Sequence, residues 1–433
     1  MVIEQSDALF RRADVILARA ARRLIPIMAL MYVASFLDRV NIGFAALQMN
    51  ADLGFSKEVY GFCAGIFFWG YFLFEVPSNL ALQKVGARLW MCRICVSWGV
   101  LSMLQAFVRD AVSLSVVRFL MGAAEAGLFP GMILYMTYWF PAATRARFIA
   151  LFLAGVPLSA VLGGPLSGWL LGLGGLGLKG WQWMLLLEGV PSLLCGIAAL
   201  WLLPDGPGKA KWLTPEEKAI IAARLAADPP GALHGIRELL TDPRIWVLII
   251  PDFSIVIALY GLNLWLPQMI AAQGYSDLQT GFIVALPYLL SVGAMVWLGR
   301  SSDRRGERAA HIAMAAVVGA LGLIGAVVFV RHGLVIASLC LATSGIYGAL
   351  AVFWTLPTAI LRGTAAAAGL ALLNSFSNLG GFFGPMLMGW AHQKSGTFTL
   401  GMVLLATMLV LAAVAVVVIH RIWFRPATER RAA

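Results

Sequence analysis

Twelve runs of about 20 mainly apolar residues divide this chain of 433 residues. A run of about 20 apolar residues is what an α-helix needs to cross the hydrocarbon core of a bilayer. Charged residues make up only 12% of the chain, roughly half of the share in a soluble domain. The pattern therefore predicts an all-α membrane protein with twelve transmembrane helices. The expected spans are residues 24–46, 59–81, 89–107, 113–137, 147–171, 183–203, 245–271, 279–299, 310–330, 334–360, 366–390 and 398–421.

The placement of lysine and arginine predicts the orientation. If twelve spans alternate, most of the 32 basic residues fall on the side that holds both termini and the even-numbered connections. Because basic loops are retained in the cytoplasm, we expect both termini to be cytoplasmic. The same bias accounts for the net charge of +11, so no nucleic-acid partner is expected.

A short internal sequence repeat indicates two related halves. Gly164-Pro165 recurs as Gly384-Pro385, and Lys84-Val-Gly86 recurs at the same spacing as Arg304-Arg-Gly306. A duplicated six-helix unit of this kind places its substrate site between the halves, near the bilayer midplane. The expected parts are a cytoplasmic segment at 1–23, a first half at 24–203, a cytoplasmic linker at 204–244, a second half at 245–421 and a tail at 422–433.

Four ionisable residues fall inside predicted spans: Asp38, Arg39, Arg118 and Glu125. Each costs roughly 2.5–3.5 kcal/mol at the centre of a membrane helix, so such groups usually mark a substrate path or a proton relay. Arg118 and Glu125 are two turns apart on one helix face. Asp38 and Arg39 diverge by about 100°, so one can face a cavity while the other faces a packed helix.

The chemistry of these residues suits anion binding and proton transfer. Arginine grips a carboxylate through two parallel hydrogen bonds and does not deprotonate. A carboxyl group taken out of water favours its neutral form, which suits a proton acceptor. In the alternative interpretation, both pairs are static salt bridges that lock spans one and four.

The connection after span eight carries a charged glycine turn, Gly299-Arg-Ser-Ser-Asp-Arg-Arg-Gly-Glu-Arg308. It resembles the loop signature of the major facilitator superfamily, which implies that Asp303, Arg304, Gly306 and Arg308 form a gating loop. The alternative is ordinary cytoplasmic charge around a turn glycine. The copy in the first half has Lys84, Gly86 and Arg88, but Gln83 stands where the acid is expected, which places a charge clamp there in doubt.

A narrower resemblance is to the anion:cation symporter family within that superfamily. It implies a bacterial inner-membrane importer of an organic anion, a mono- or dicarboxylate, coupled to protons. It also implies that Asp38 and Glu125 carry protons and that Arg39, Arg118, Tyr71 and Asn374 bind the anion. The segments that carry the resemblance are Phe36–Phe44, Glu75–Asn79, Val85–Arg88, Arg118–Gly127, Gly180–Trp183, Leu187–Gly189 and Asn374–Gly381.

Other polar residues allow two interpretations. Tyr71 shares a helix face with Glu75 and is either a substrate contact or a packed tyrosine. Asn374 and Asn378 either contact substrate or join helices by hydrogen bonds. Glu188 and Asp252 lie near predicted span ends, so we expect them to reach water and to be structural. Possible lining residues are Thr355, Trp354, Trp265 and Gln268.

Several functional classes lack support. The chain has no phosphate-binding Gly-rich loop ending in Lys-Ser/Thr, and its five histidines are scattered. We therefore expect no enzyme activity, no cofactor and no metal site. The expected protein is a monomeric transporter whose partners are the bilayer, protons and a small organic anion. The alternatives are a proton-driven exporter of an aromatic or drug-like compound and a membrane receptor that binds without turnover.

Overall fold

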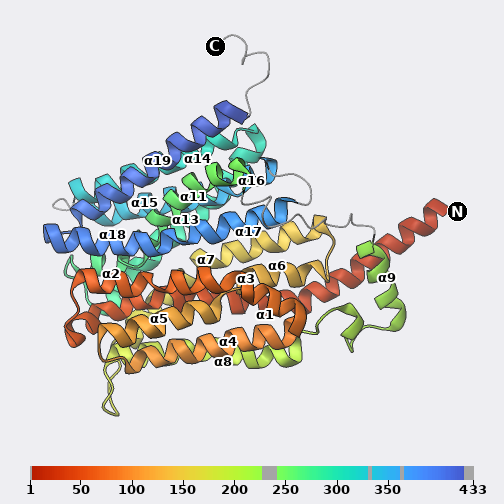
Figure 1. Ribbon diagram of the computed structural model, residues 1–433, viewed down its shortest axis with the longest axis horizontal. Coiled ribbons are helices and arrows are strands. Elements are labelled where there is room, and N and C mark those ends of the chain that lie inside the picture. The colour runs from red at the N-terminus through yellow and green to blue at the C-terminus, as the bar shows by residue number, and fades with distance from the viewer. Residues whose placement is uncertain (1, 227–240, 330–333, 361–364, 424–433) are drawn as a thin grey trace, which may run out of the picture.

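The computed structural model describes residues 2–226, 241–329, 334–360 and 365–423, and over these residues every regular element is a helix. Two layers are evident in Figure 1, with α1 to α8 below and α11 to α19 above. The first half contains α1 (Val2–Leu53), α2 (Lys57–Gly65), α3 (Phe67–Val85), α4 (Ala87–Leu104), η1 (Gln105–Phe107), α5 (Ala111–Glu125), α6 (Leu128–Thr137), α7 (Ala142–Leu170) and α8 (Gly180–Leu202). The linker contains η2 (Pro207–Lys209) and α9 (Pro215–Ala226). The second half contains α11 (Pro243–Asn263), α12 (Leu266–Ala271), α13 (Asp277–Arg305), α14 (Arg308–Val328), α15 (Val335–Phe353), α16 (Thr355–Ile360), α17 (Ala365–Asn378), α18 (Gly380–Ser395) and α19 (Thr399–Trp423).

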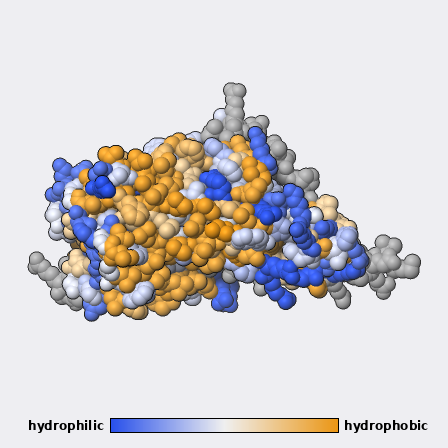
Figure 2. All heavy atoms as spheres, turned by 90° about the horizontal axis from the view of Figure 1, so that it is seen from below, coloured by the Kyte–Doolittle hydropathy of each residue, from blue (hydrophilic) through white to orange (hydrophobic). Residues whose placement is uncertain are grey.

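These helices confirm the predicted fold of twelve membrane-crossing segments. Ten helical segments of the described chain are long and apolar enough to cross a bilayer. The helix α7 and the consecutive pair α17 and α18 pack among them and supply the remaining two segments. Figure 2 shows the corresponding surface, a broad apolar band with polar side chains gathered toward its two ends.

Several spans consist of two helices separated by a short break. Span four breaks directly after Glu125, where Ala126 leaves the helical conformation and Gly127 has a φ of 87°. A side chain at Gly127 would also approach Ser78 closely, because a Cβ there would lie 2.5 Å from the Ser78 Oγ. The break therefore places the Glu125 carboxyl group at the end of a half-helix, inside the bundle.

The two halves pack tightly at one end of the bundle, here called the distal end, on the left of Figure 1. The helix α7 lies against α13, and α2 lies against α18. Glycines permit both contacts: a Cβ on Gly281 would lie 2.3 Å from the Gly164 carbonyl oxygen, and one on Gly61 would lie 2.5 Å from the Pro385 carbonyl oxygen. No larger residue fits at these positions without moving a helix backbone.

The opposite end, here called the linker end, holds the N-terminus and α9. The N-terminal segment, expected in the cytoplasm at 1–23, forms the start of α1 from Val2 onward, and α1 is a single helix of 52 residues. Arg12 donates two hydrogen bonds to Glu216, and Arg19 pairs with Glu217. The pKa of Glu217 is held below its usual value by the Thr214 backbone N–H and by the Arg19 guanidinium. The start of α1 is thus held against the linker.

Candidate functional site

Arg39 lies at the centre of the bundle and contacts both halves. Its guanidinium forms an ion pair with Glu125 of the first half and donates a 2.9 Å hydrogen bond to the Tyr260 hydroxyl of the second half. It also lies over the rings of Phe36 and Tyr71, 4.8 and 5.3 Å from their centroids. These contacts hold a permanent cation at the junction of α1, α5 and α11, in a setting that suits binding of a carboxylate.

Asp38 points the other way, as the divergence of neighbouring helical positions predicts. It accepts hydrogen bonds from Trp98 at 2.7 Å, from Ser102 at 3.0 Å and from Ser192. These donors belong to α4 and α8, so Asp38 is enclosed within the first half. It is fully buried and does not pair with Arg39.

Arg118 is also fully buried but has a different environment. It donates a 2.9 Å hydrogen bond to the Ala64 carbonyl oxygen, and its guanidinium lies 5.0 Å from the centroid of the Phe67 ring. Within the described residues it forms no ion pair, and its Nε has no hydrogen-bond partner. Arg39 is thus paired with a carboxylate, whereas Arg118 contacts a carbonyl oxygen and an aromatic ring.

Tyr71 and Glu75 share a helix face but have different partners. Tyr71 packs beside Arg39, whereas Glu75 accepts hydrogen bonds from Asn374, at 3.3 Å, and from Ser375. These contacts join α3 of the first half to α17 of the second half. The structure therefore places Tyr71 in the central cluster and attaches Asn374 to it through Glu75.

Thr355 lies apart from that cluster, at the start of α16. Its hydroxyl donates to the Val352 carbonyl oxygen at 2.7 Å, and its own carbonyl oxygen accepts a 3.3 Å hydrogen bond from Arg308. Arg308 also pairs with Asp303 at 3.9 Å, beside Gly306, whose φ is 68°. The structure thus groups Thr355 with the charged loop after span eight, and it leaves Arg304 exposed there.

The first-half loop has an acid that the sequence pattern does not reveal. Gly86 has a φ of 98°, and Asp205 at the start of the linker accepts a 3.0 Å hydrogen bond from the Arg88 backbone N–H. A Cβ on Gly86 would lie 2.7 Å from the same carboxylate. Asp205 therefore supplies the first-half loop with a carboxylate from the linker, whereas the position where the sequence pattern expects an acid holds the uncharged Gln83. Lys84 is exposed beside it.

The expectation that Glu188 and Asp252 reach water is wrong. Each is only 1% exposed. Ser167 donates a 2.6 Å hydrogen bond to Glu188, and Asp252 faces the Ser377 hydroxyl. Asp252 lies at the middle of α11 and Glu188 lies within one turn of the middle of α8, and both side chains point between packed helices. The 3.6-residue period of each helix was the signal that could have shown this.

Two of the possible lining residues lie in the distal contact. The Trp265 indole donates to the Pro385 carbonyl oxygen at 3.1 Å, and Gln268 accepts a 2.8 Å hydrogen bond from Lys57. The first bond lies within the second half and the second joins α12 to α2 of the first half, so both side chains stabilise the packed distal end. They do not contact the Arg39 cluster through any hydrogen bond found in the described residues.

Comparison with known proteins identifies the family. The sequence profile of the Major Facilitator Superfamily matches residues 28–368. A putative tartrate transporter of Agrobacterium vitis is 47% identical over 94% of this chain and 91% of its own length. The putative metabolite transport protein NicT of Pseudomonas putida is 44% identical over 87% of each chain. A quinolone resistance transporter of Acinetobacter baumannii is 37% identical over 92% of this chain and 93% of its own length.

Solved structures of other transporters have a similar fold. The crystal structure of a D-xylose-proton symporter superposes with a TM-score of 0.74 over 91% of this chain and 96% of that one. At 16% identity this likeness concerns the fold alone. The profile match and the relatives together agree with the resemblance to organic-acid permeases found in the sequence. The chain therefore belongs to the Major Facilitator Superfamily, as a multi-pass transporter of the bacterial inner membrane and not an enzyme.

Proposed function

We propose that this transporter takes up a small organic carboxylate together with protons, by alternating access. The observation that carries the proposal is the buried ion pair between Arg39 and Glu125, which spans α1 and α5. The relatives named as tartrate transporters support a carboxylate as the substrate class. We further propose that the protein acts as a monomer with both termini in the cytoplasm.

The ion pair supplies a physical reason for coupling. Arg39 cannot hold a substrate carboxylate and Glu125 in the same geometry, because both acids need the same guanidinium donors. A proton on Glu125 removes its charge and frees Arg39. Proton binding and anion binding therefore favour each other, which is the requirement for symport.

The charges of the central residues lead to the same cycle. Asp38, Arg39, Arg118 and Glu125 sum to zero when both acids are ionised and to +1 when one acid is protonated. The protonated carrier binds the anion on the outside with Arg39 and Arg118, and Tyr71 and Asn374 complete the site. It then turns inward, releases the anion and loses the proton to the cytoplasm.

The test is transport by purified protein in liposomes, with tartrate as the first probe and an imposed gradient, acid outside. We expect accumulation of tartrate that a protonophore abolishes. We expect Glu125→Gln to lose this accumulation while still exchanging internal for external tartrate, because glutamine mimics the protonated acid. Glu58→Gln, at an exposed position of α2, is the matched control and should behave as the wild type. Uptake that ignores the protonophore, or full coupling in Glu125→Gln, would contradict the proposal.

The relative named as a quinolone resistance transporter favours a second candidate, proton-driven export of an aromatic acid. The ring-lined setting of Arg39 is compatible with such a substrate. Deletion and overexpression strains separate the two functions. Greater sensitivity of the deletion strain to quinolones, with unchanged growth on every organic acid tested, would favour export over uptake.

A further inference from the structure

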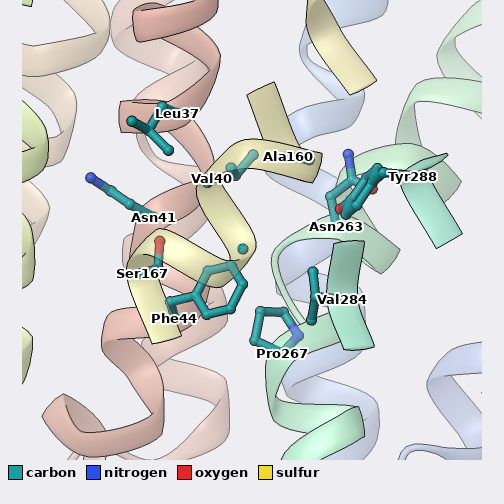
Figure 3. A pocket seen from close by; sticks show the side chains of 12 residues that line it. Leu37, Val40, Asn41, Phe44, Ala160, Ser167, Asn263, Pro267, Val284 and Tyr288 are labelled. Carbon is teal, nitrogen blue, oxygen red and sulfur yellow. The ribbon is translucent and has the colours of Figure 1, made fainter. Parts of the chain in front are cut away.

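A small cavity lies between the two halves, on the distal side of Arg39. Figure 3 shows Asn41 and Ser167 on one side of it, with the Asn41 amide directed away from the cavity, and Asn263 and Tyr288 on the other side. The volume in which the centre of a water molecule fits is about 10 Å³. One buried water needs about this much space. The space is of the size of one water, and its mainly apolar wall includes the polar side chains of Ser167 from the first half and Asn263 from the second.

Glu188 of α8 lies behind the wall of this cavity. Its carboxyl group accepts a 2.6 Å hydrogen bond from the lining residue Ser167 and faces the amide of the lining residue Asn41. Both acid and amide are nine-tenths or more buried. Over the described chain, Glu188 Oε2 and both ends of the Asn41 amide have no hydrogen-bond partner. Buried polar groups normally have one, so this cluster suits a bound water.

Glu188 is also connected to Asp38. Ser192 follows Glu188 by one turn of α8, and its hydroxyl donates to Asp38. Asn41 follows Asp38 by one turn of α1. The two carboxyl groups interact electrostatically across the contact between α1 and α8. Two acids, two hydroxyl groups and an amide thus follow one another from the cavity to the interior of the first half.

The surroundings of Glu188 hold few other ionisable groups. Asp38 is the charged group that acts on it from α1. The buried thiols of Cys95 on α4 and Cys195 on α8 interact with Asp38. The contact from α7 is the uncharged Ser167. Proton exchange at Glu188 is therefore governed mainly by Asp38 and by access to water.

We propose that Glu188 is a third proton-carrying acid, which takes protons from the distal side through the cavity and passes them to Asp38. This inference rests on the proposed proton-coupled uptake. In the transfer, the Glu188 carboxyl gives its proton to a bridging water, and the water gives a proton to the Ser192 hydroxyl. Ser192 gives its own proton to the Asp38 carboxylate. One carboxylic acid becomes a carboxylate and one carboxylate becomes a carboxylic acid, so the total charge is unchanged.

The position of the cavity links this transfer to alternating access. Its walls belong to α1 and α7 on one side and to α11, α12 and α13 on the other. In this structure the contact of Gly164 with Gly281 closes the distal side beside it. Separation of the halves at that end would expose Asn41 and Ser167, and through them Glu188, to outside water.

Transport by Glu188→Gln in liposomes is the first test, with tartrate as the probe. We expect loss of pH-driven accumulation and retention of tartrate exchange at equal pH, because the anion site is intact. Asp252→Asn is the matched control, since Asp252 is equally buried in the second half, and it should retain both activities. Wild-type accumulation in Glu188→Gln, or loss of accumulation in Asp252→Asn as well, would overturn the proposal.

Ser192→Ala keeps the acid but removes the hydroxyl that reaches Asp38, so it covers the case in which Glu188→Gln does not fold. We expect it to slow pH-driven uptake while exchange continues. Wild-type uptake in Ser192→Ala, or loss of exchange together with uptake, would count against the relay.

Infrared spectroscopy provides a readout that needs no transport. We expect the wild type, without substrate, to show a protonated-carboxyl band that changes with pH and exchanges in heavy water, and Glu188→Gln to lack that band. An unchanged spectrum in Glu188→Gln would overturn the proposal even if symport is confirmed. Wild-type uptake that ignores a pH gradient would instead overturn the proposed symport, and the relay with it.

Discussion

Arg39 combines three kinds of contact on one side chain: an ion pair with Glu125, a hydrogen bond to Tyr260 and stacking on aromatic rings. The planar guanidinium makes this combination possible, because its N–H donors point outward in the plane of the group while its two faces remain free to stack on aromatic rings. Arg39 therefore connects Glu125 to the opposite half of the molecule.

Arg39→Lys tests that role. Lysine keeps the charge but loses the fork of donors and the flat face. Each hydrogen bond to a charged group contributes about 1.5–3 kcal/mol, so we expect the apparent affinity for the transported acid to fall on the order of ten- to hundredfold. Concentration dependence of tartrate exchange measures this. Arg23→Lys is the control, because Arg23 also stacks on a ring, that of Trp212, but outside the site. Equal effects of the two substitutions would contradict the assignment.

For single residues, the sequence predicts the direction in which a side chain points better than it predicts which residue that side chain contacts. The divergence of Asp38 from Arg39 follows from helix geometry and is what the structure has. That Arg39 pairs with Glu125 depends on how α1 packs against α5, which no local pattern encodes. Asp205 was missed for the same reason, since it approaches Gly86 only through the fold.

Among the helices, the contacts that close the distal end are built from glycine. The pair α7 and α13 is repeated by the pair α18 and α2, as expected for two related halves, because span five corresponds to span eleven and span two to span eight. Backbones in such contacts approach more closely than any side chain allows. The stability of the closed distal end therefore depends on a few positions in each pair.

Gly281→Ala tests this dependence. The added Cβ would lie 2.3 Å from the Gly164 carbonyl oxygen, and overpacking of this kind costs about 1–3 kcal/mol. We expect a shift toward the state with the distal end open. A cysteine in place of Val284, which is buried beside the cavity, should then react faster with maleimide in a background without native cysteines.

Gly293→Ala is the control for that experiment. It lies on the same helix, α13, and a Cβ there would have no atom within 4 Å in the structure described. It should leave the labelling rate unchanged. Equal rates in Gly281→Ala and the parent protein would show that the close contact does not determine the closed state.

The sequence indicates most of the helices but not their breaks. Apolar runs locate the spans because the bilayer sets their length. The break after Glu125 and the continuity of α1 with its N-terminal segment have no such signal. Gly127 follows a helical pattern in the sequence, and its positive φ and its close approach to Ser78 show why a glycine is required at the break.

For the whole molecule, hydropathy predicts the apolar band of Figure 2, and the internal sequence repeat predicts the two layers of Figure 1. The bounds of the two halves and the orientation remain predictions. The orientation rests on the excess of lysine and arginine at the linker end, because positive loops resist translocation.

Labelling of introduced cysteines in intact cells tests the orientation. Gly174 lies in the distal loop between α7 and α8, where an added side chain meets no atom within 4 Å, and Lys211 is exposed in the linker. We expect a membrane-impermeant maleimide to label Gly174→Cys and to leave Lys211→Cys unlabelled until the cells are opened. The opposite pattern would place both termini outside.

The unbroken α1 also has a mechanical consequence. Arg12 and Arg39 lie on one helix, about 40 Å apart at 1.5 Å per residue. A tilt of about 10° that pivots at Arg39 would swing Arg12 through about 7 Å, more than twice the reach of a hydrogen bond. The 2.7 Å contact of Arg12 with Glu216 therefore either breaks or moves α9 with it. Where that contact holds and α1 stays straight across Pro26, a tilt around the central arginine also moves the segment that joins the two halves.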